Sequence, residues 1–428
     1  MGAKIVEKNA DGFTITITIP HATSMLAFEE NIQKAVNDVG RVSTQEALTH
    51  FDTDGSPLVI GNQKLFSKGK EPKRYQTPYG PTTVNRHCYQ SSSGGKTFCP
   101  LEQAARIVLT STPKFAKMIS SKYADLGASR VLADMVQNHG RNLTRSQVQN
   151  IAEAVGAVVE AKEDSWRYAI PELDKTVSSV SIGMDGTCML LCEDGYREAM
   201  VGTIALYDKQ GDRMHTIYTA ASPEYGKETF LKRFEGEINQ IKSLYPKATY
   251  VGLADGASCN WTFLSAFTEI QTIDFWHVTE YLGKAATAIF RGKRKLEERE
   301  EWLENACHKL KHNVGGAARL LTELKEHRED QKLPAADGKK LNSTITYLEN
   351  HKSKMKFSKS VDNNLPIGSG VTEAGCKVIV KQRMCGSSMK WKDEGASTVL
   401  RLRTLNYTKD RWDQFWQKVD RYGIPVAA

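Results

Sequence analysis

The spacing of apolar and polar residues changes character several times along the chain. Residues 14–19 read TITITI, and this strict alternation predicts a β-strand. Residues 21–40 show helical spacing, and Gly40 is expected to end that helix. Residues 52–100 hold clusters of Gly, Pro, Lys and Ser without a clear period, so we expect loops and turns there.

The next stretch, residues 101–163, shows helical spacing alone and predicts three consecutive helices. Thr144 and Gln147 have the spacing of a capping box at the start of the last one. The turn before that helix and its basic front are compatible with a helix-turn-helix in which Arg141 and Arg145 contact DNA. The alternative is a small helical bundle with a polar face.

Residues 177–276 alternate between β-rich runs, turn signals and two helical segments in the order βββαβαβ. This order predicts an α/β fold in which an antiparallel meander is joined to a crossover unit. One β-rich run, VSSVSIGM, is followed by Asp185, and another, ATYVGLA, is followed by Asp255. Residues 277–360 return to helical spacing and are rich in Lys and Glu, and a further helix carries Glu373.

The pattern divides the chain into five expected segments. A mixed, loop-rich segment comes first and is followed by a helical segment, the first part of the α/β core, an all-α insertion, and the last core helix with a helical tail. Their expected bounds are 1–100, 101–170, 171–276, 277–362 and 363–428.

Composition narrows the class of protein. The 428 residues carry a net charge of +8 and 40% hydrophobic residues, which favours a soluble protein with a polyanionic partner. The sequence has no apolar run of membrane-spanning length and no apolar signal-peptide region, so no membrane partner is expected. The eight cysteines form no CxxC pair, which is typical of reduced thiols in the cytoplasm.

Two histidine-containing groups are candidate zinc sites. His87, Cys88 and Cys99 have a spacing that matches no standard zinc pattern. His308 and His312 have the i,i+4 spacing of a zinc-binding helix, but no third ligand is evident near them in the sequence. A solvated helix face is the simpler interpretation of the second group.

Three carboxylates stand out more strongly. Asp185 and Asp255 each end an apolar run, where an unpaired carboxylate is costly and where open α/β sheets place their functional sites. On a helix over 369–384, Glu373 shares a face with Lys377, Lys381, Val380 and Met384, while Val371, Gly375, Val378 and Ile379 are expected to face the sheet. An ordinary Glu373–Lys377 pair is the alternative for that helix.

Three clustered carboxylates oppose one another's ionisation, and divalent cations reverse that balance. Oxygen ligands of this kind suit Mg²⁺ or Mn²⁺. Two such ions activate a nucleophile and stabilise the leaving oxygen of a phosphodiester. The sequence therefore predicts a two-metal site for phosphodiester chemistry.

The sequence motifs around these residues are similar to those of a known family. The motifs GMDGT, LADGA, DFWHVTEYL and IGSGVTEAGCKVIVKQRMCGSSMKW resemble bacterial insertion-sequence DDE transposases of the ISKra type, which are related to Mutator-like elements. The resemblance extends from about residue 85 to the C-terminal WDQFW. It implies an RNase H-like core interrupted by an all-α insertion domain.

The resemblance also implies roles for individual residues. Asp185 would contact both metal ions, and Asp255 and Glu373 would each hold one. His277, in a D-x-x-H pattern with Asp274, would lie near the cleaved phosphate, although a packing role at a helix start is the alternative. The basic residues after Glu373 would contact DNA, or would be ordinary surface charges: Lys377, Lys381 and Arg383.

The expected function is therefore a DNA transposase that binds the terminal inverted repeats of its element and inserts them into target DNA. It would act as a homodimer or higher oligomer on DNA, in the bacterial cytoplasm in association with the nucleoid. Two alternatives remain open at this point. One is an RNase H-like nuclease or resolvase without strand transfer, and the other is a domesticated DNA-binding protein without catalysis.

Overall fold

The computed structural model describes residues 2–224, 227–330 and 333–424. The chain forms two compact units. The first contains Met1–Ala169, Ser397–Asn406 and Asp410–Ala428, and the second contains Ile170–Ala396 and Tyr407–Lys409. Helices and sheets are mixed, which places the protein in the α/β class. None of the described helices is long and apolar enough to cross a membrane.

The first unit contains two antiparallel sheets. Strands β1 (Lys4–Lys8) and β2 (Phe13–Thr16) form a pair, so the predicted strand over 14–19 is confirmed only in its first half. A second sheet has the strand order β3-β4-β5-β6. Its strands are β3 (Leu58–Ile60), β4 (Gln63–Thr77), β5 (Gly80–Ser91) and β6 (Gly94–Phe98).

This four-stranded sheet overturns the expectation of loops over 52–100. Most β4 side chains are exposed, so charged residues occupy the strand and conceal the alternation that a half-buried strand normally shows. A register shift between Ser67 and Lys70 interrupts the period further. The buried residues that support the sheet, among them Tyr75, Val84 and Tyr89, are too widely spaced to form a recognisable run.

Helix α1 (Met25–Thr49) continues past Gly40, where the sequence predicted its end. A Cβ atom at Gly40 would lie 2.2 Å from the ring of Tyr79. The glycine is therefore required by close packing against the turn between β4 and β5, and it does not act as a helix terminator.

The expected helices over 101–163 are confirmed, although the first is short and the second is divided into two helices at Gly127. They are α2 (Pro100–Ala104), α3 (Pro113–Asp125), α4 (Ala128–His139) and α5 (Arg145–Lys162). The Thr144–Gln147 capping box is present. Helices α3, α4 and α5 pack around buried apolar residues such as Phe115, Met135 and Val155. Helix α16 (Arg411–Tyr422) also belongs to this unit, as does most of α15 (Asp393–Tyr407).

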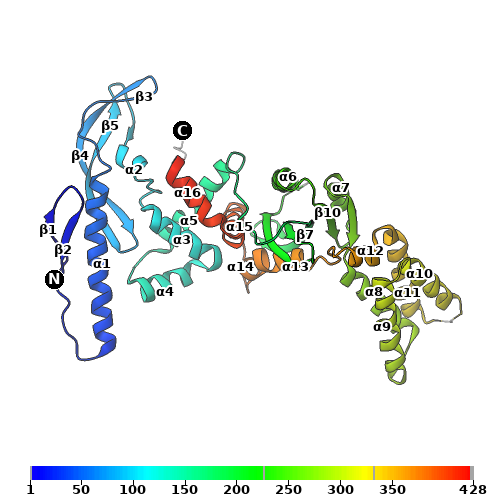
Figure 1. Cartoon of the computed structure of the whole chain (residues 1–428). Helices are drawn as coiled ribbons and strands as arrows, with labels where there is room; N and C mark the ends of the chain where they lie inside the picture. The colour runs from blue at the N-terminus through cyan, green and yellow to red at the C-terminus, as the bar shows by residue number, and fades with distance from the viewer. Residues whose placement is uncertain (1, 225–226, 331–332, 425–428) are drawn as a thin grey trace. The chain divides into compact units, whose positions relative to one another are not determined.

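The second unit is built on a five-stranded sheet with the order β11-β10-β7-β8-β9. Figure 1 labels two of its strands, β7 and β10. Strands β7 (Ser179–Leu191), β8 (Gly195–Tyr207) and β9 (Arg213–Ala221) form an antiparallel meander. Strands β10 (Thr249–Ala254) and β11 (Ile270–Ile273) run parallel to β7. The predicted order βββαβαβ is confirmed, with helices α6 (Glu228–Leu244) and α7 (Ser258–Phe267) in the expected places.

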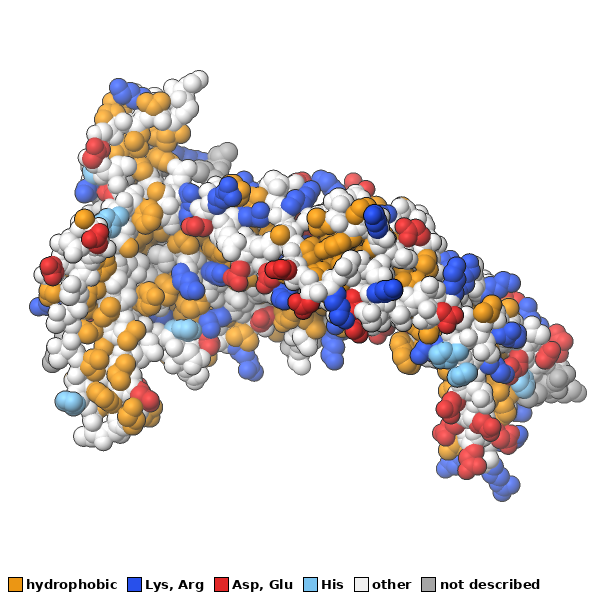
Figure 2. All heavy atoms as spheres, viewed as in Figure 1, with side chains coloured by type: hydrophobic (Ala, Val, Ile, Leu, Met, Phe, Trp, Pro, Cys, Tyr) orange, Lys and Arg blue, Asp and Glu red, His pale blue; other side chains and the backbone are white. Residues whose placement is uncertain are grey.

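An all-helical segment follows the sheet, as predicted. It consists of α8 (Phe275–Ile289), α9 (Leu296–His312), α10 (Gly316–Asp330), α11 (Ala335–His351) and α12 (Phe357–Asp362), with short 3₁₀ turns at Lys293–Lys295 and Lys352–Lys354. Buried residues of these helices join the core of the sheet in one continuous apolar cluster. Acidic and basic side chains are interspersed on the visible surface of this segment (Figure 2).

The helix that carries Glu373 differs from a regular helix over 369–384. It begins as α13 (Gly370–Gly375), continues as a π-helical stretch (Cys376–Lys381), and ends as α14 (Gln382–Met384). Wider turns shift the face that each later residue occupies. The predicted grouping is therefore wrong for Val380 and Met384, which are buried while Glu373 is exposed.

Candidate active site

Asp185 lies within strand β7 and not at its end, which corrects the sequence-based expectation. Strand β10 pairs with β7 only as far as Leu253, which lies opposite Gly183. Beyond that point β7 continues to Leu191 with β8 as its partner. Asp185 therefore lies where β7 loses its parallel neighbour, and Asp255 is the first residue after β10 on that side.

The first two carboxylates influence each other electrostatically. Burial raises the pKa of Asp185, and the negative charges of Asp255 and Glu198 raise it further. A 2.7 Å hydrogen bond from the backbone N–H of Gly186 to Oδ1 of Asp185 opposes this rise. Asp185 is half-buried and Asp255 is exposed, so the pair lies at the boundary between the sheet and solvent.

Glu373 is held near the same strand by the packing of α13. The Thr372 hydroxyl lies 2.7 Å from the Thr203 hydroxyl of β8, and both residues are buried. A Cβ atom at Gly183 would lie 2.2 Å from Oγ1 of Thr372, so only glycine permits α13 to approach β7 this closely. Ser369 donates a 2.9 Å hydrogen bond to Oε1 of Glu373.

Cys376 links the surroundings of Glu373 to those of Asp185. Its Sγ lies 3.8 Å from Oδ2 of Asp185. Burial raises the pKa of Cys376 to about 12, with contributions from the charges of Asp185 and Glu373. Because Cys376 directly follows the helical turn that carries Glu373 and its thiol contacts Asp185, the two carboxylates lie in the same part of the unit. Among the described residues, however, no three His, Cys, Asp or Glu side chains are already arranged to hold a metal ion.

The donor set fits a hard divalent cation. Asp185, Asp255 and Glu373 offer only carboxylate oxygens, the ligand type that Mg²⁺ and Mn²⁺ prefer. Two of these carboxylates repel each other and one is partly desolvated, a balance that a bound cation reverses.

A fourth carboxylate, which could not be predicted from the sequence, lies beside Asp185. Glu198 of β8 pairs with Cys188 of β7, and its side chain covers Gly186, where an added Cβ would be 2.1 Å from the carboxyl carbon of Glu198. Glu198 also forms a 2.8 Å ion pair with Lys227. Only the register of the β7–β8 hairpin brings Glu198 here, and in the sequence it is one polar residue of an exposed strand end.

The expected D-x-x-H pattern has a clear local role. Oδ1 of the buried Asp274 caps α8 by accepting a 2.5 Å hydrogen bond from the backbone N–H of His277. The other oxygen, Oδ2, accepts a hydrogen bond from the backbone N–H of Ser369. Asp274 therefore fastens the start of α8 to the segment that leads into Glu373. The His277 side chain is partly exposed and lies 3.6 Å from Oε2 of Glu280.

Aromatic residues of α8 and α11 lie next to Asp255, which the sequence did not indicate. Tyr347 donates a 2.9 Å hydrogen bond to the backbone carbonyl of Asp255, 92 positions earlier in the chain. Tyr347 stacks on Tyr281 with ring centroids 4.0 Å apart, and His277 packs edge-on against both rings. The helices after β11 thus help to position the loop that contains Asp255.

The predicted DNA-contacting residues fall into two groups. Lys377, Lys381 and Arg145 are exposed. Arg383 is buried and stacks on Trp391, with its guanidinium carbon 4.9 Å from the ring centroid. Arg141 is also buried, stacks on Phe115 and donates a 2.8 Å hydrogen bond to Gln76. The expectation that Arg383 and Arg141 contact DNA is therefore corrected, because both are internal packing residues.

The two histidine-containing groups considered for zinc have other partners. Nδ1 of His87 lies 3.1 Å from Oδ2 of Asp52, and Cys88 accepts a 2.8 Å hydrogen bond from Arg86. On α9, the rings of His308 and His312 pack together with centroids 4.8 Å apart.

Comparison with models of protein families finds no match to this chain, and a search of curated proteins finds no similar sequence.

Proposed function

We propose that the protein is a DDE transposase with an RNase H-like core, interrupted by the all-α segment between β11 and α13. The observation that carries the proposal is the placement of three elements: β7 carries Asp185 just beyond its pairing with β10, Asp255 directly follows β10, and α13, which carries Glu373, packs against β7. The sheet supports it, because three antiparallel strands are followed by two strands parallel to the first. A carboxylate in one central strand, a second directly after the neighbouring strand and a third on a later helix can share metal ions at the sheet edge.

Asp185, Asp255 and Glu373 would hold two Mg²⁺ or Mn²⁺ ions. When bound, these ions lower the pKa of the attacking hydroxyl group and neutralise charge on the leaving oxygen. Asp274 and Ser369 keep the Glu373 segment fixed against α8, so the third carboxylate is positioned before DNA binds. Exposed Lys377 and Lys381, which follow Glu373, would contact phosphates beside the cleaved bond, and His277 would orient the cleaved phosphate.

In the proposed reaction, water first attacks the phosphorus at the transposon end, and the P–O3′ bond breaks to leave a free 3′-hydroxyl. That hydroxyl oxygen then attacks a target phosphorus. The target 3′-oxygen leaves, so one phosphodiester bond forms for each one broken. The protein would act on paired terminal inverted repeats as a homodimer or higher oligomer.

Strand transfer tests the proposal directly. The substrate is labelled DNA from the inverted repeats that flank the coding sequence, mixed with supercoiled target DNA and Mg²⁺ or Mn²⁺. The wild-type protein should join the labelled end to the target, and Asp185→Asn should abolish joining. Asp194→Asn is the matched control, because Asp194 precedes a glycine in the same strand hairpin but is exposed at its turn. Intact joining by Asp185→Asn would reject the proposed active site.

The same assay separates the alternatives. Cleavage of end DNA without joined product would identify an RNase H-like nuclease or resolvase. Metal-independent binding without any cleavage would identify a domesticated DNA-binding protein. In all three cases the affinity for duplex DNA should fall as salt rises. The slope of log affinity against log salt concentration should be about −0.9 per neutralised phosphate.

A further inference from the structure

A cavity of about 740 Å³ lies where strands β7, β10 and β11 begin, at the end of the sheet opposite Asp255. Thr249, the first residue of β10, lines it, whereas Asp255 follows the last residue of the same strand. The cavity is therefore separate from the carboxylate site. Its walls come from the strand starts, the β8–β9 turn, and the segment around α12.

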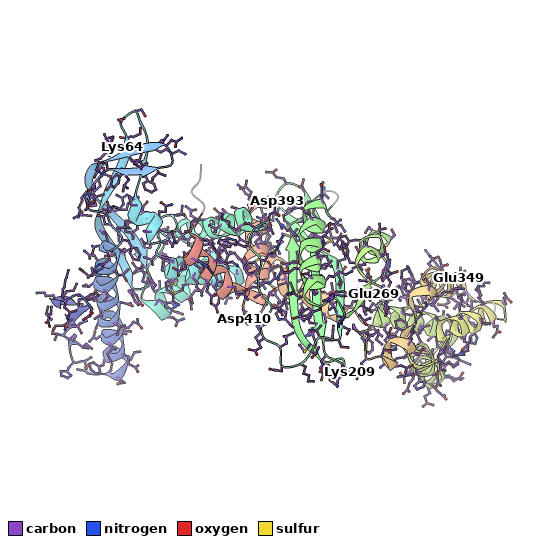
Figure 3. All side chains as sticks on the ribbon, turned by 45° about the horizontal axis from the view of Figure 1, so that its top comes forward. Lys64, Lys209, Glu269, Glu349, Asp393 and Asp410 are labelled. Carbon is purple, nitrogen blue, oxygen red and sulfur yellow. The ribbon has the colours of Figure 1, made fainter. Side chains whose placement is uncertain are left out.

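The charged residues that line the cavity are mainly lysines. Its lining includes four lysines and two acidic residues. The lysines are Lys209, Lys354, Lys356 and Lys359, and the acidic residues are Glu269 and Asp362. None of the four lysines forms an ion pair with a described residue. The ammonium group of the half-buried Lys354 lies 5.1 Å from the ring centroid of Trp261, and the other three lysines are exposed. One oxygen of Glu269 is already engaged, because it accepts a 3.1 Å hydrogen bond from the backbone N–H of Tyr250. Figure 3 labels Lys209 and Glu269 in the unit that contains this sheet.

Three of the lysines lie on residues 354–359, a segment anchored by buried side chains. Met355 and Phe357 are buried in the main core, and Phe357 packs edge-on against Phe275 at 5.2 Å between centroids. These anchors fix the backbone that carries Lys354, Lys356 and Lys359. An array held in place loses less entropy on binding than lysines on a free loop.

Two asparagines join the lysine-bearing backbone to its surroundings. The side chain of Asn364 donates a 3.2 Å hydrogen bond to the carbonyl of Lys209, and Asn363 donates a 2.7 Å hydrogen bond to the carbonyl of Lys359. Their amide groups are thereby oriented, and their oxygens are left as acceptors beside the lysines. Gln271 and Ser353 add further polar groups to the wall.

We infer that this cavity binds an unpaired DNA segment, with its phosphates on the lysines and a base against the amide side chains. Lysine ammonium groups bind phosphates as point charges, and amide groups hydrogen-bond to base edges. A cavity of several hundred Å³ admits one or two unpaired nucleotides, whereas a duplex would lie across its mouth. The inference rests on the proposed function, because it makes a DNA strand the substrate of this unit.

Fluorescence anisotropy of the full chain with labelled dT20 tests the inference in EDTA. The triple variant Lys209→Gln, Lys356→Gln, Lys359→Gln is compared with Lys293→Gln, Lys339→Gln, Lys409→Gln. The control lysines are exposed and lie in the same unit, and both variants lose the same charge. The first variant should bind dT20 about 10-fold or more weakly. The slope of its log affinity against log salt concentration should be shallower by about 2, because each lost phosphate contact contributes about 0.7 on a single strand. The control should change affinity less than about 2-fold.

Each other outcome overturns the inference. Equal losses in the two variants would show a general charge effect, and no loss in the first variant would show that the cavity does not bind the strand. A loss confined to duplex DNA would show that the lysines contact an outer duplex surface. If dATP displaced dT20 at equal concentration, the occupant would be a free nucleotide. Because strand transfer needs a divalent ion and this assay contains EDTA, the two proposals can fail separately.

Discussion

The two ends of the five-stranded sheet differ in charge and in construction. One end gathers Asp185, Asp255 and Glu373, whose charges raise the pKa of neighbouring groups. The other end presents four lysines around a cavity. The same sheet therefore has acidic side chains near one end and lysines near the other.

The two ends also depend on different parts of the chain. The acidic residues come from positions 185, 255 and 373, so that end forms only when α13 packs on β7 and β8. Three of the four lysines come from one segment, residues 354–359, which its own buried residues hold in place. Loss of the α13 contact should therefore affect the acidic end and leave the basic end intact.

The largest expected effect comes from the other two carboxylates. Asp255→Asn and Glu373→Gln should each reduce cleavage of end DNA by about 10²–10³-fold, the range for loss of one electrostatic stabiliser in an active site. The matched control is Asp337→Asn, which makes the same change in another Asp-Gly pair, in α11. Cleavage is measured on labelled end DNA with Mg²⁺, and dT20 binding in EDTA should not change by more than about 2-fold. Full cleavage activity in Glu373→Gln would show that Glu373 is not part of the active site.

The second unit was largely predictable from the sequence, because its strands are long, apolar and separated by clear turns. Strand β8, for example, is buried over its whole second half. The β4–β5 sheet was not predictable, because its exposed lysines and a register shift conceal the period. Both sheets obey the same hydrogen-bonding rules, so the difference lies in how much of each strand is buried.

The candidate site was predictable in part. Each of its two aspartates follows an apolar run, which points to a strand edge. The partners of these aspartates were not predictable, because Glu198, Tyr347 and Cys376 reach the site through strand register or helix packing. The opposite misjudgement concerns Arg141 and Arg383, whose charges suggested DNA contact although both side chains are buried. An arginine whose guanidinium group stacks on an aromatic ring can be buried, and the sequence does not reveal this stacking.

A medium effect is expected at the contact that assembles the acidic end. Thr372→Val removes the hydroxyl that meets Thr203 at 2.7 Å, leaving a buried hydroxyl without that partner. The free energy of unfolding should fall by about 1–3 kcal/mol, as measured by urea titration. Cleavage activity should fall as well, because α13 carries Glu373.

A double variant sharpens this test. Thr203→Val with Thr372→Val replaces both hydroxyls by methyl groups, so stability should largely return towards wild type. Thr262→Val on α7 is the control, because that residue is exposed. An additive loss in the double variant would show that the two threonines do not interact, and would leave α13 without its proposed anchor.

The smallest effect concerns Tyr250, on β10 near the lysine end. Burial raises its pKa to about 12, and the charge of Glu269 contributes. Because the folded-state pKa lies above the usual 10, the associated stability is present below about pH 10 and is lost as pH rises towards 12. Tyr250→Phe loses the 2.9 Å hydrogen bond to the carbonyl of Tyr245, so the free energy of unfolding at pH 7 should fall by about 1 kcal/mol.

The pH dependence distinguishes this cause from a simple packing defect. Urea titrations at pH 7, 10 and 11.5 should show a smaller alkaline loss in Tyr250→Phe than in the wild type, because the variant has no phenol to ionise at that position. The control is Tyr196→Phe, whose ring is 72% exposed and whose removal should leave both values unchanged. If Tyr250→Phe loses stability as steeply as wild type above pH 10, other buried tyrosines such as Tyr207 govern the alkaline transition. In that case the lysine end would have no special sensitivity to high pH.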